Sequence, residues 1–168
     1  MTPADFVRWL DHTEIARDFA GSSVAYPLVL ATHMSCIALF GGMIVMTNLR
    51  LLGLVMKDFP VAEVYSYLRA PKRVGFVIMV TCGMLLAASE ASKYYPNPYF
   101  WVKMLLLALI GVHALVFRRS VYQKLAAFET AIPTNAKLAA TLSLALWLGV
   151  AISGRLIGYF TLQYRLPR

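Results

Sequence analysis

Five ionisable residues lie inside or at the edges of long apolar runs, and they are the first candidates for chemistry. They are His33, Glu90, Lys103, His113 and Arg155. An ionisable group is costly to place in the hydrocarbon core of a membrane, so each position indicates a function unless its side chain finds water or a partner. The two histidines indicate a metal or a haem, because neutral imidazole is a common metal ligand and an axial ligand of haem iron.

His33 and His113 are therefore the candidate metal ligands, with haem b as the expected cofactor. The estimated ends of their helices place them about six residues apart in depth, or roughly 9 Å at the helical rise. This offset disfavours one iron held between both imidazoles. It leaves His33 alone, His33 with Met84, a second site at His113, or no metal at all. For each histidine the alternative is a packed, hydrogen-bonded core residue.

The other three ionisable residues, Glu90, Lys103 and Arg155, gather toward one face of the membrane. Their distances from flanking basic residues, counted at about 1.5 Å per residue, place them near the same surface. They either form an ion network at the headgroup level or extend separately into the interface. We expect Lys103 and Arg155 to neutralise haem propionates or to contact a quinone headgroup.

Four apolar segments must position these side chains. The chain has 168 residues, of which 60% are hydrophobic and 14% are charged, against about 25% charged residues in an ordinary soluble domain. This composition excludes a water-soluble globule. Segments of about 20 apolar residues are long enough to span a bilayer, and they occur at about 24–46, 74–91, 100–117 and 136–160. The sequence therefore predicts an all-α, four-helix transmembrane bundle that forms one integral membrane domain over residues 1–168.

Two further helices are expected outside these spans. Residues 3–20 have helical spacing of apolar residues with acidic residues between them, and Thr2 and Asp5 can form a capping box at the start. This pattern predicts an amphipathic helix in the interface, with an ordinary polar tail as the alternative. Residues 61–68 predict a short helix on the opposite membrane surface.

The distribution of basic residues predicts the orientation. The formal net charge is +8, but the 16 Lys and Arg residues are spread along the chain, so we expect contact with membrane lipids and none with nucleic acid. Nine of them lie on the side of the connections after the first and third spans. Because Lys and Arg favour the cytoplasmic side, both termini are predicted to be periplasmic.

Several motifs connect the chain to a known group of proteins. They are Tyr26-Pro27, His33, Asn48-Leu49-Arg50-Leu51-Leu52-Gly53, Phe100, Lys103, Ser143-Leu144, Leu146-Trp147 and Gly154-Arg155-Leu156-Ile157-Gly158-Tyr159. From about Ser22 to Tyr159 the chain resembles an uncharacterised family of small bacterial four-helix integral membrane proteins. The Leu-Arg-Leu-Leu-Gly and Gly-Arg-x-Ile-Gly-Tyr segments are unusual together and carry most of the resemblance.

The resemblance implies a bacterial inner-membrane protein of about four helices. It also implies Asp at the position of Asn48 and often Asn at the position of His113. Since His113 departs from that pattern, His33, Arg50 and Arg155 become the stronger functional candidates.

From these residues we expect a small bacterial inner-membrane subunit that carries a b-type haem and passes electrons between the quinone pool and a periplasmic partner. One alternative is a non-redox permease, or an accessory subunit for a metal ion or small solute, with His33, Glu90 and Arg155 along a polar path. Another is a purely structural subunit whose polar residues pair with a further chain, in a homo- or hetero-oligomer.

Overall fold

Every regular secondary-structure element that the structure describes is a helix. The computed structural model describes residues 2–117, 121, 124 and 132–165, and no strand occurs among them. The helices are α1 (Pro3–Asp11), α2 (Glu14–Gly21), α3 (Ala25–Leu51), α4 (Val61–Ser89), α5 (Ala91–Tyr94), α6 (Pro98–Phe117) and α7 (Thr134–Arg165).

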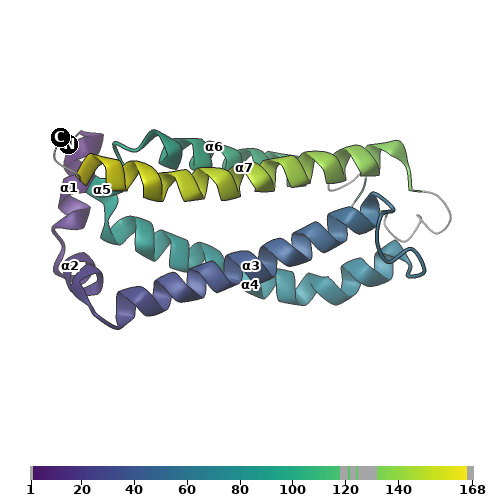
Figure 1. The fold of residues 1–168 in the computed structure, drawn as a ribbon, viewed down its shortest axis with the longest axis horizontal. Coiled ribbons are helices and arrows are strands. Elements are labelled where there is room, and N and C mark those ends of the chain that lie inside the picture. Colours follow the sequence, from purple (N-terminus) through teal and green to yellow (C-terminus); the bar gives the residue numbers. More distant parts are fainter. Residues whose placement is uncertain (1, 118–120, 122–123, 125–131, 166–168) are drawn as a thin grey trace.

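Four of these helices are long and apolar enough to cross a membrane, which confirms the predicted four-helix transmembrane bundle. They are α3, α4, α6 and residues Thr134–Phe160 of α7. Helix α3 packs along α4 and α6 packs along α7, so the bundle consists of two antiparallel hairpins (Figure 1). Contacts between α3 and α7 join the two hairpins.

The short helices cover one end of the bundle. Helices α1, α2 and α5 lie together there, beside the C-terminal end of α7 (Figure 1). We call this end the capped end. The opposite end, called the core end, holds a buried apolar cluster of Leu51, Val61, Val121, Ala136, Ala139 and Ala140. The small alanines lie on one face of α7, where they allow close helix packing.

Two expected elements differ from the structure. Residues 61–68 are not a separate surface helix, because α4 begins at Val61 and continues through Pro71. Burial of Val61 and Val64 holds the first turns of α4 in place despite the hydrogen bond that Pro71 removes. The expected helix over 3–20 is two helices, since the Thr13 hydroxyl accepts a hydrogen bond from the Ala16 amide and starts α2 anew.

A seven-residue repeat aligns α3 with α4. Seven residues are almost two helical turns, so residues at this spacing share one face of a helix. The repeat produces three layers about 10 Å apart along the axis. From the capped end inward these are a polar layer with Tyr26 and Glu90, a histidine layer with His33 and Gly83, and an aromatic layer with Phe40 and Phe76.

Helix α7 continues two of these layers. Its Trp147 ring lies 5.3 Å from the Phe40 ring, centroid to centroid, in the aromatic layer. Gly154 follows seven residues later on the same face and lies beside Lys103 of α6. The histidine layer therefore contains one residue from each spanning helix: His33, Gly83, Lys103 and Gly154.

Candidate functional site

His33 is held in one orientation by a backbone hydrogen bond. Its Nδ1 lies 2.8 Å from the carbonyl oxygen of Met79 on α4. A carbonyl oxygen can only accept, so Nδ1 carries the proton, and the neutral imidazole keeps a lone pair on Nε2. Within residues 2–117 and 132–165, Nε2 has no hydrogen-bond partner. The imidazole therefore keeps one free hydrogen-bond acceptor, Nε2.

Gly83 makes room for this imidazole. A Cβ atom built at Gly83 would lie 2.9 Å from Cε1 of His33, which is closer than van der Waals contact allows. Any larger residue would push the ring away from α4 and from the Met79 carbonyl. Gly83 of α4 and His33 of α3 are therefore packing partners.

Lys103 brings an ammonium group to the same layer. It lies five residues after the start of α6, so its depth is roughly 8 Å below that helix end. Its Nζ lies 3.9 Å from the position of a Cβ built at Gly154, the glycine that follows Trp147 by seven residues on α7. Among the residues that the structure describes, Lys103 makes no ion pair and no hydrogen bond. The layer therefore combines a hydrogen-bond acceptor with an unpaired cationic donor.

The aromatic layer closes the site toward the core end. Phe40 is 6% exposed and contacts both Phe76 and Trp147, with ring centroids 5.9 Å and 5.3 Å apart. These rings have no titratable group, and they pack at angles of 47° and 74° to the Phe40 ring, so the layer is an apolar cluster of tilted and edge-to-face rings.

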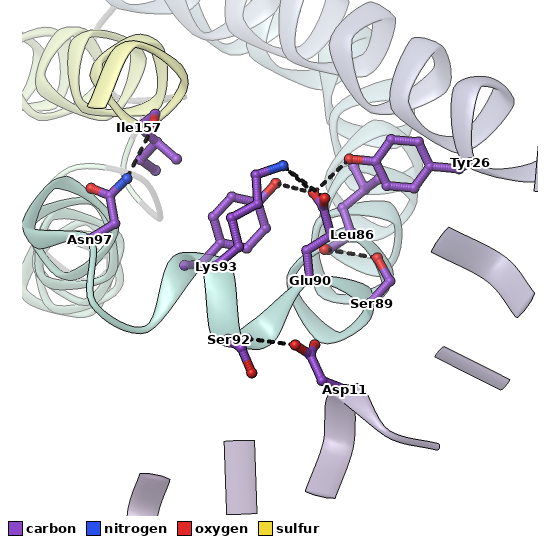
Figure 2. Close-up of polar contacts among 10 residues, drawn as sticks. Asp11, Tyr26, Leu86, Ser89, Glu90, Ser92, Lys93, Asn97 and Ile157 are labelled. Atoms are coloured by element: carbon purple, nitrogen blue, oxygen red, sulfur yellow. Dashed lines mark hydrogen bonds and ion pairs between the residues drawn. The ribbon is translucent and has the colours of Figure 1, made fainter. Parts of the chain in front are cut away.

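The polar layer lies between the histidine layer and the capped end, and it is centred on Glu90. Figure 2 shows Tyr26 and Lys93 directed at the Glu90 carboxylate. Tyr26 donates to Glu90 at 2.9 Å, Lys93 donates to both carboxylate oxygens at 2.8 Å, and Tyr94 donates at 3.2 Å. These bonds join α3 and α5 to the end of α4.

Charge in the polar layer follows from these contacts. Burial disfavours the ionised form of Glu90, but the hydrogen bonds from Lys93, Tyr26 and Tyr94 and the Lys93 charge outweigh it and lower the pKa of Glu90. Burial, together with the nearby Glu90 charge, raises the pKa of Tyr94. At neutral pH the layer is therefore a carboxylate held by an ammonium and two neutral phenols.

The expected network of Glu90, Lys103 and Arg155 is not what the structure shows in its described part. Glu90 forms its salt bridge with Lys93, a residue that the sequence does not mark as a partner. Arg155 is exposed on the outside of α7, where its guanidinium lies 4.7 Å from the centre of the Tyr159 ring. Arg155 therefore contacts Tyr159 and makes no ion pair with Glu90 among the described residues.

His113 occupies a different level from His33. Its Nε2 lies 2.9 Å from the Ala139 carbonyl oxygen, its ring centre is 4.9 Å from that of Phe117, and it is 6% exposed. It follows Lys103 by ten residues on α6, or roughly 15 Å of helix. This geometry fits the packed core residue and gives no support to one iron shared by both histidines. The described residues also contain no group of three side chains that could hold a metal ion.

Arg50 shapes a loop at the core end. Its Nε and Nη2 donate to the Phe59 carbonyl oxygen at 3.0 and 2.7 Å. Just after it, the Gly53 amide bonds to the Arg50 carbonyl and the Leu54 amide to the Leu49 carbonyl, each at 3.0 Å. This pattern ends a helix with a left-handed glycine, and Gly53 has a φ of 76°. The Leu-Arg-Leu-Leu-Gly segment thus ends α3, and its arginine fixes the following loop through the Phe59 carbonyl.

Sequence reasoning missed two groups that organise the site. The Met79 carbonyl sets the His33 tautomer, and nothing in a side-chain pattern reveals a backbone acceptor. Asn97, which is 1% exposed, donates to the Ile157 carbonyl at 3.2 Å and ties the start of α6 to α7. Its position before Pro98 is the usable signal, because Asn is a favoured helix cap.

Comparison with known proteins places the chain in one group. A family model described as a family of unknown function, DUF6644, matches residues 12–160. No curated protein and no solved structure matches the chain. The match covers all four spans up to Phe160, and it confirms the resemblance seen in the motifs. The chain therefore belongs to DUF6644, a family of unknown function.

Proposed function

We propose that this protein is a small electron-transfer subunit of the bacterial inner membrane that works between the quinone pool and a periplasmic partner. The histidine layer is its ligand site, and the ring headgroup of a quinone is the ligand. The observation that carries the proposal is that the layer holds two complementary groups: Lys103, an ammonium without an anionic partner in the described residues, and His33, whose Nε2 can only accept a hydrogen bond. The capped end is on the periplasmic side.

Several features of the layer suit a quinone headgroup. The Lys103 ammonium can donate to a ring oxygen, and charged donors form the stronger hydrogen bonds. Gly83 and Gly154 add no side-chain volume to the layer. Phe40 and Trp147 make the next layer apolar and aromatic, and the depth of Lys103 is within reach of a lipid-soluble headgroup.

Binding of decylubiquinone in lipid nanodiscs tests the proposal. Calorimetric titration should show saturable binding to the wild type beyond that of empty nanodiscs. Lys103→Met should weaken the affinity at least about tenfold, because it removes a charged hydrogen bond. Arg155→Gln is the matched control, since Arg155 is a cation of similar depth on the outside of α7, and it should bind like the wild type. Absence of saturable binding would overturn the proposal.

Haem b is the second candidate ligand, and the tautomer of His33 favours it. Metal-bound histidines commonly donate their other ring N–H to a carbonyl or carboxylate, as His33 does to Met79. His33 would then be an axial ligand, and Lys103 would face a propionate. When bound, haem b supplies one-electron transfer. His113 would not contribute to the same iron, because it is bonded to α7 at another level.

An absorption spectrum separates the two candidates. Protein purified from haem-replete cells should show a Soret band and a reduced-minus-oxidised α-band if it carries haem b. His33→Ala should abolish both bands, and His12→Ala, which changes an exposed histidine in the turn after α1, should keep them. A colourless preparation would exclude the haem candidate and leave the quinone site as proposed.

A further inference from the structure

The hydrogen-bond polarity of the histidine layer distinguishes the two redox forms of a quinone. We propose that the layer binds the reduced quinol in preference to the oxidised quinone, with His33 as the group that selects between them. This inference rests on the proposed function, and it assigns separate roles to His33 and Lys103.

The selection follows from which atoms donate. Quinone oxygens are carbonyls that only accept, whereas quinol oxygens are hydroxyls that also donate. The Nδ1–H of His33 is committed to the Met79 carbonyl, so Nε2 can only accept. A quinol hydroxyl can donate to Nε2, but a quinone carbonyl would bring its lone pairs against the lone pair of the imidazole. Polar groups buried without a partner are costly, so this mismatch disfavours the quinone.

Lys103 does not make this distinction. Its ammonium donates to an oxygen of either form, because both a carbonyl and a hydroxyl oxygen accept. Lys103 should therefore contribute to the affinity of both forms about equally. The difference between quinol and quinone comes from His33 alone.

The backbone of α4 keeps the imidazole in the selecting tautomer. Moving the proton to Nε2 would place an Nδ1 lone pair 2.8 Å from the Met79 carbonyl oxygen. Gly83 lets the ring lie against α4 at the distance that this bond requires. The Met79 carbonyl and Gly83 thus determine the selectivity, although neither would contact the ligand.

The test compares decylubiquinol and decylubiquinone in nanodiscs by calorimetry under anaerobic conditions. The wild type should bind the quinol about tenfold more tightly, the difference that one buried hydrogen bond produces. His33→Ala removes both the acceptor for the quinol hydroxyl and the lone pair that repels the quinone carbonyl. It should therefore weaken quinol binding, strengthen quinone binding and bring the ratio of the two affinities to about one. Lys103→Met should weaken both forms by the same factor. His12→Ala and Arg155→Gln should match the wild type.

Gly83→Ala provides a second variant that keeps the imidazole. Its new Cβ displaces the ring from Met79, so the quinol-to-quinone affinity ratio should fall toward one. Equal wild-type affinities for the two forms, with a loss in Lys103→Met, would overturn the selectivity and leave the quinone site intact. Failure of both forms to bind would instead overturn the proposed function.

Discussion

At the scale of single residues, Glu90 concentrates more hydrogen bonds than any other side chain in the polar layer. It accepts from Tyr26 of α3 and from Lys93 and Tyr94 of α5. Glu90→Ala would leave these half-buried donors without an acceptor. We expect the free energy of unfolding in detergent to fall by about 1–3 kcal/mol. Glu63→Ala, at an exposed glutamate on α4, is the control and should change it by less than about 0.5 kcal/mol; an equal loss in both variants would contradict this role of Glu90.

The lowered pKa of Glu90 makes its contribution depend on pH. Its folded pKa lies below the ordinary glutamate value, which is about 4.3 in the unfolded chain. The ionised carboxylate therefore stabilises the folded state above that value, and the contribution disappears as the pH falls through the folded pKa. The stability difference between wild type and Glu90→Gln should shrink as the pH falls below the ordinary glutamate pKa and through the folded pKa of Glu90. Denaturant unfolding at several pH values measures it, and a difference that does not vary with pH would refute the expectation.

The elements of the fold were predictable where composition alone decides them. Four apolar runs gave four spans, since length and hydropathy suffice to identify a transmembrane helix. The start of α4 was not predictable in the same way. Pro71 and the basic residues Lys72 and Arg73 after it placed the predicted start of the span at 74, but Val61 and Val64 are buried against the core end and extend the helix. That burial depends on other segments, so no local pattern reveals it.

The end of α3 offers a test at the scale of one element. Gly53 has a φ of 76°, a conformation that costs any residue with a Cβ about 1–2 kcal/mol. Gly53→Ala should therefore lower the free energy of unfolding by about 1 kcal/mol. Gly41→Ala is the matched control, because Gly41 is helical and nothing lies within 4 Å of a Cβ built there. It should be neutral or stabilise the helix, and a loss as large as that of Gly53→Ala would contradict the helix-terminator role.

At the scale of the whole molecule, the sequence predicted the residues of the candidate site but not their arrangement. His33 and Lys103 were identifiable because ionisable residues are conspicuous in apolar runs. Their convergence was not, since it depends on the relative heights of four helices. The seven-residue spacing from Tyr26 through His33 to Phe40 was the available signal, and it becomes informative only when α4 and α7 are placed beside it. Lys93 was missed because it belongs to a short helix outside every span.

The orientation of the whole molecule is the remaining prediction. Helix α1 and the C-terminal end of α7 lie at the same end of the bundle (Figure 1). Nine of the 16 Lys and Arg residues belong to the side of the core end, and positive charge favours the cytoplasm. Alkaline phosphatase, which is active only in the periplasm, should therefore be active when fused after α7 or within 95–97. It should be inactive when inserted within 55–58, between α3 and α4, where a fluorescent protein that folds only in the cytoplasm should report instead. The opposite pattern of reporter activity would show that the predicted orientation is wrong and that the histidine layer lies in the cytoplasmic half of the membrane.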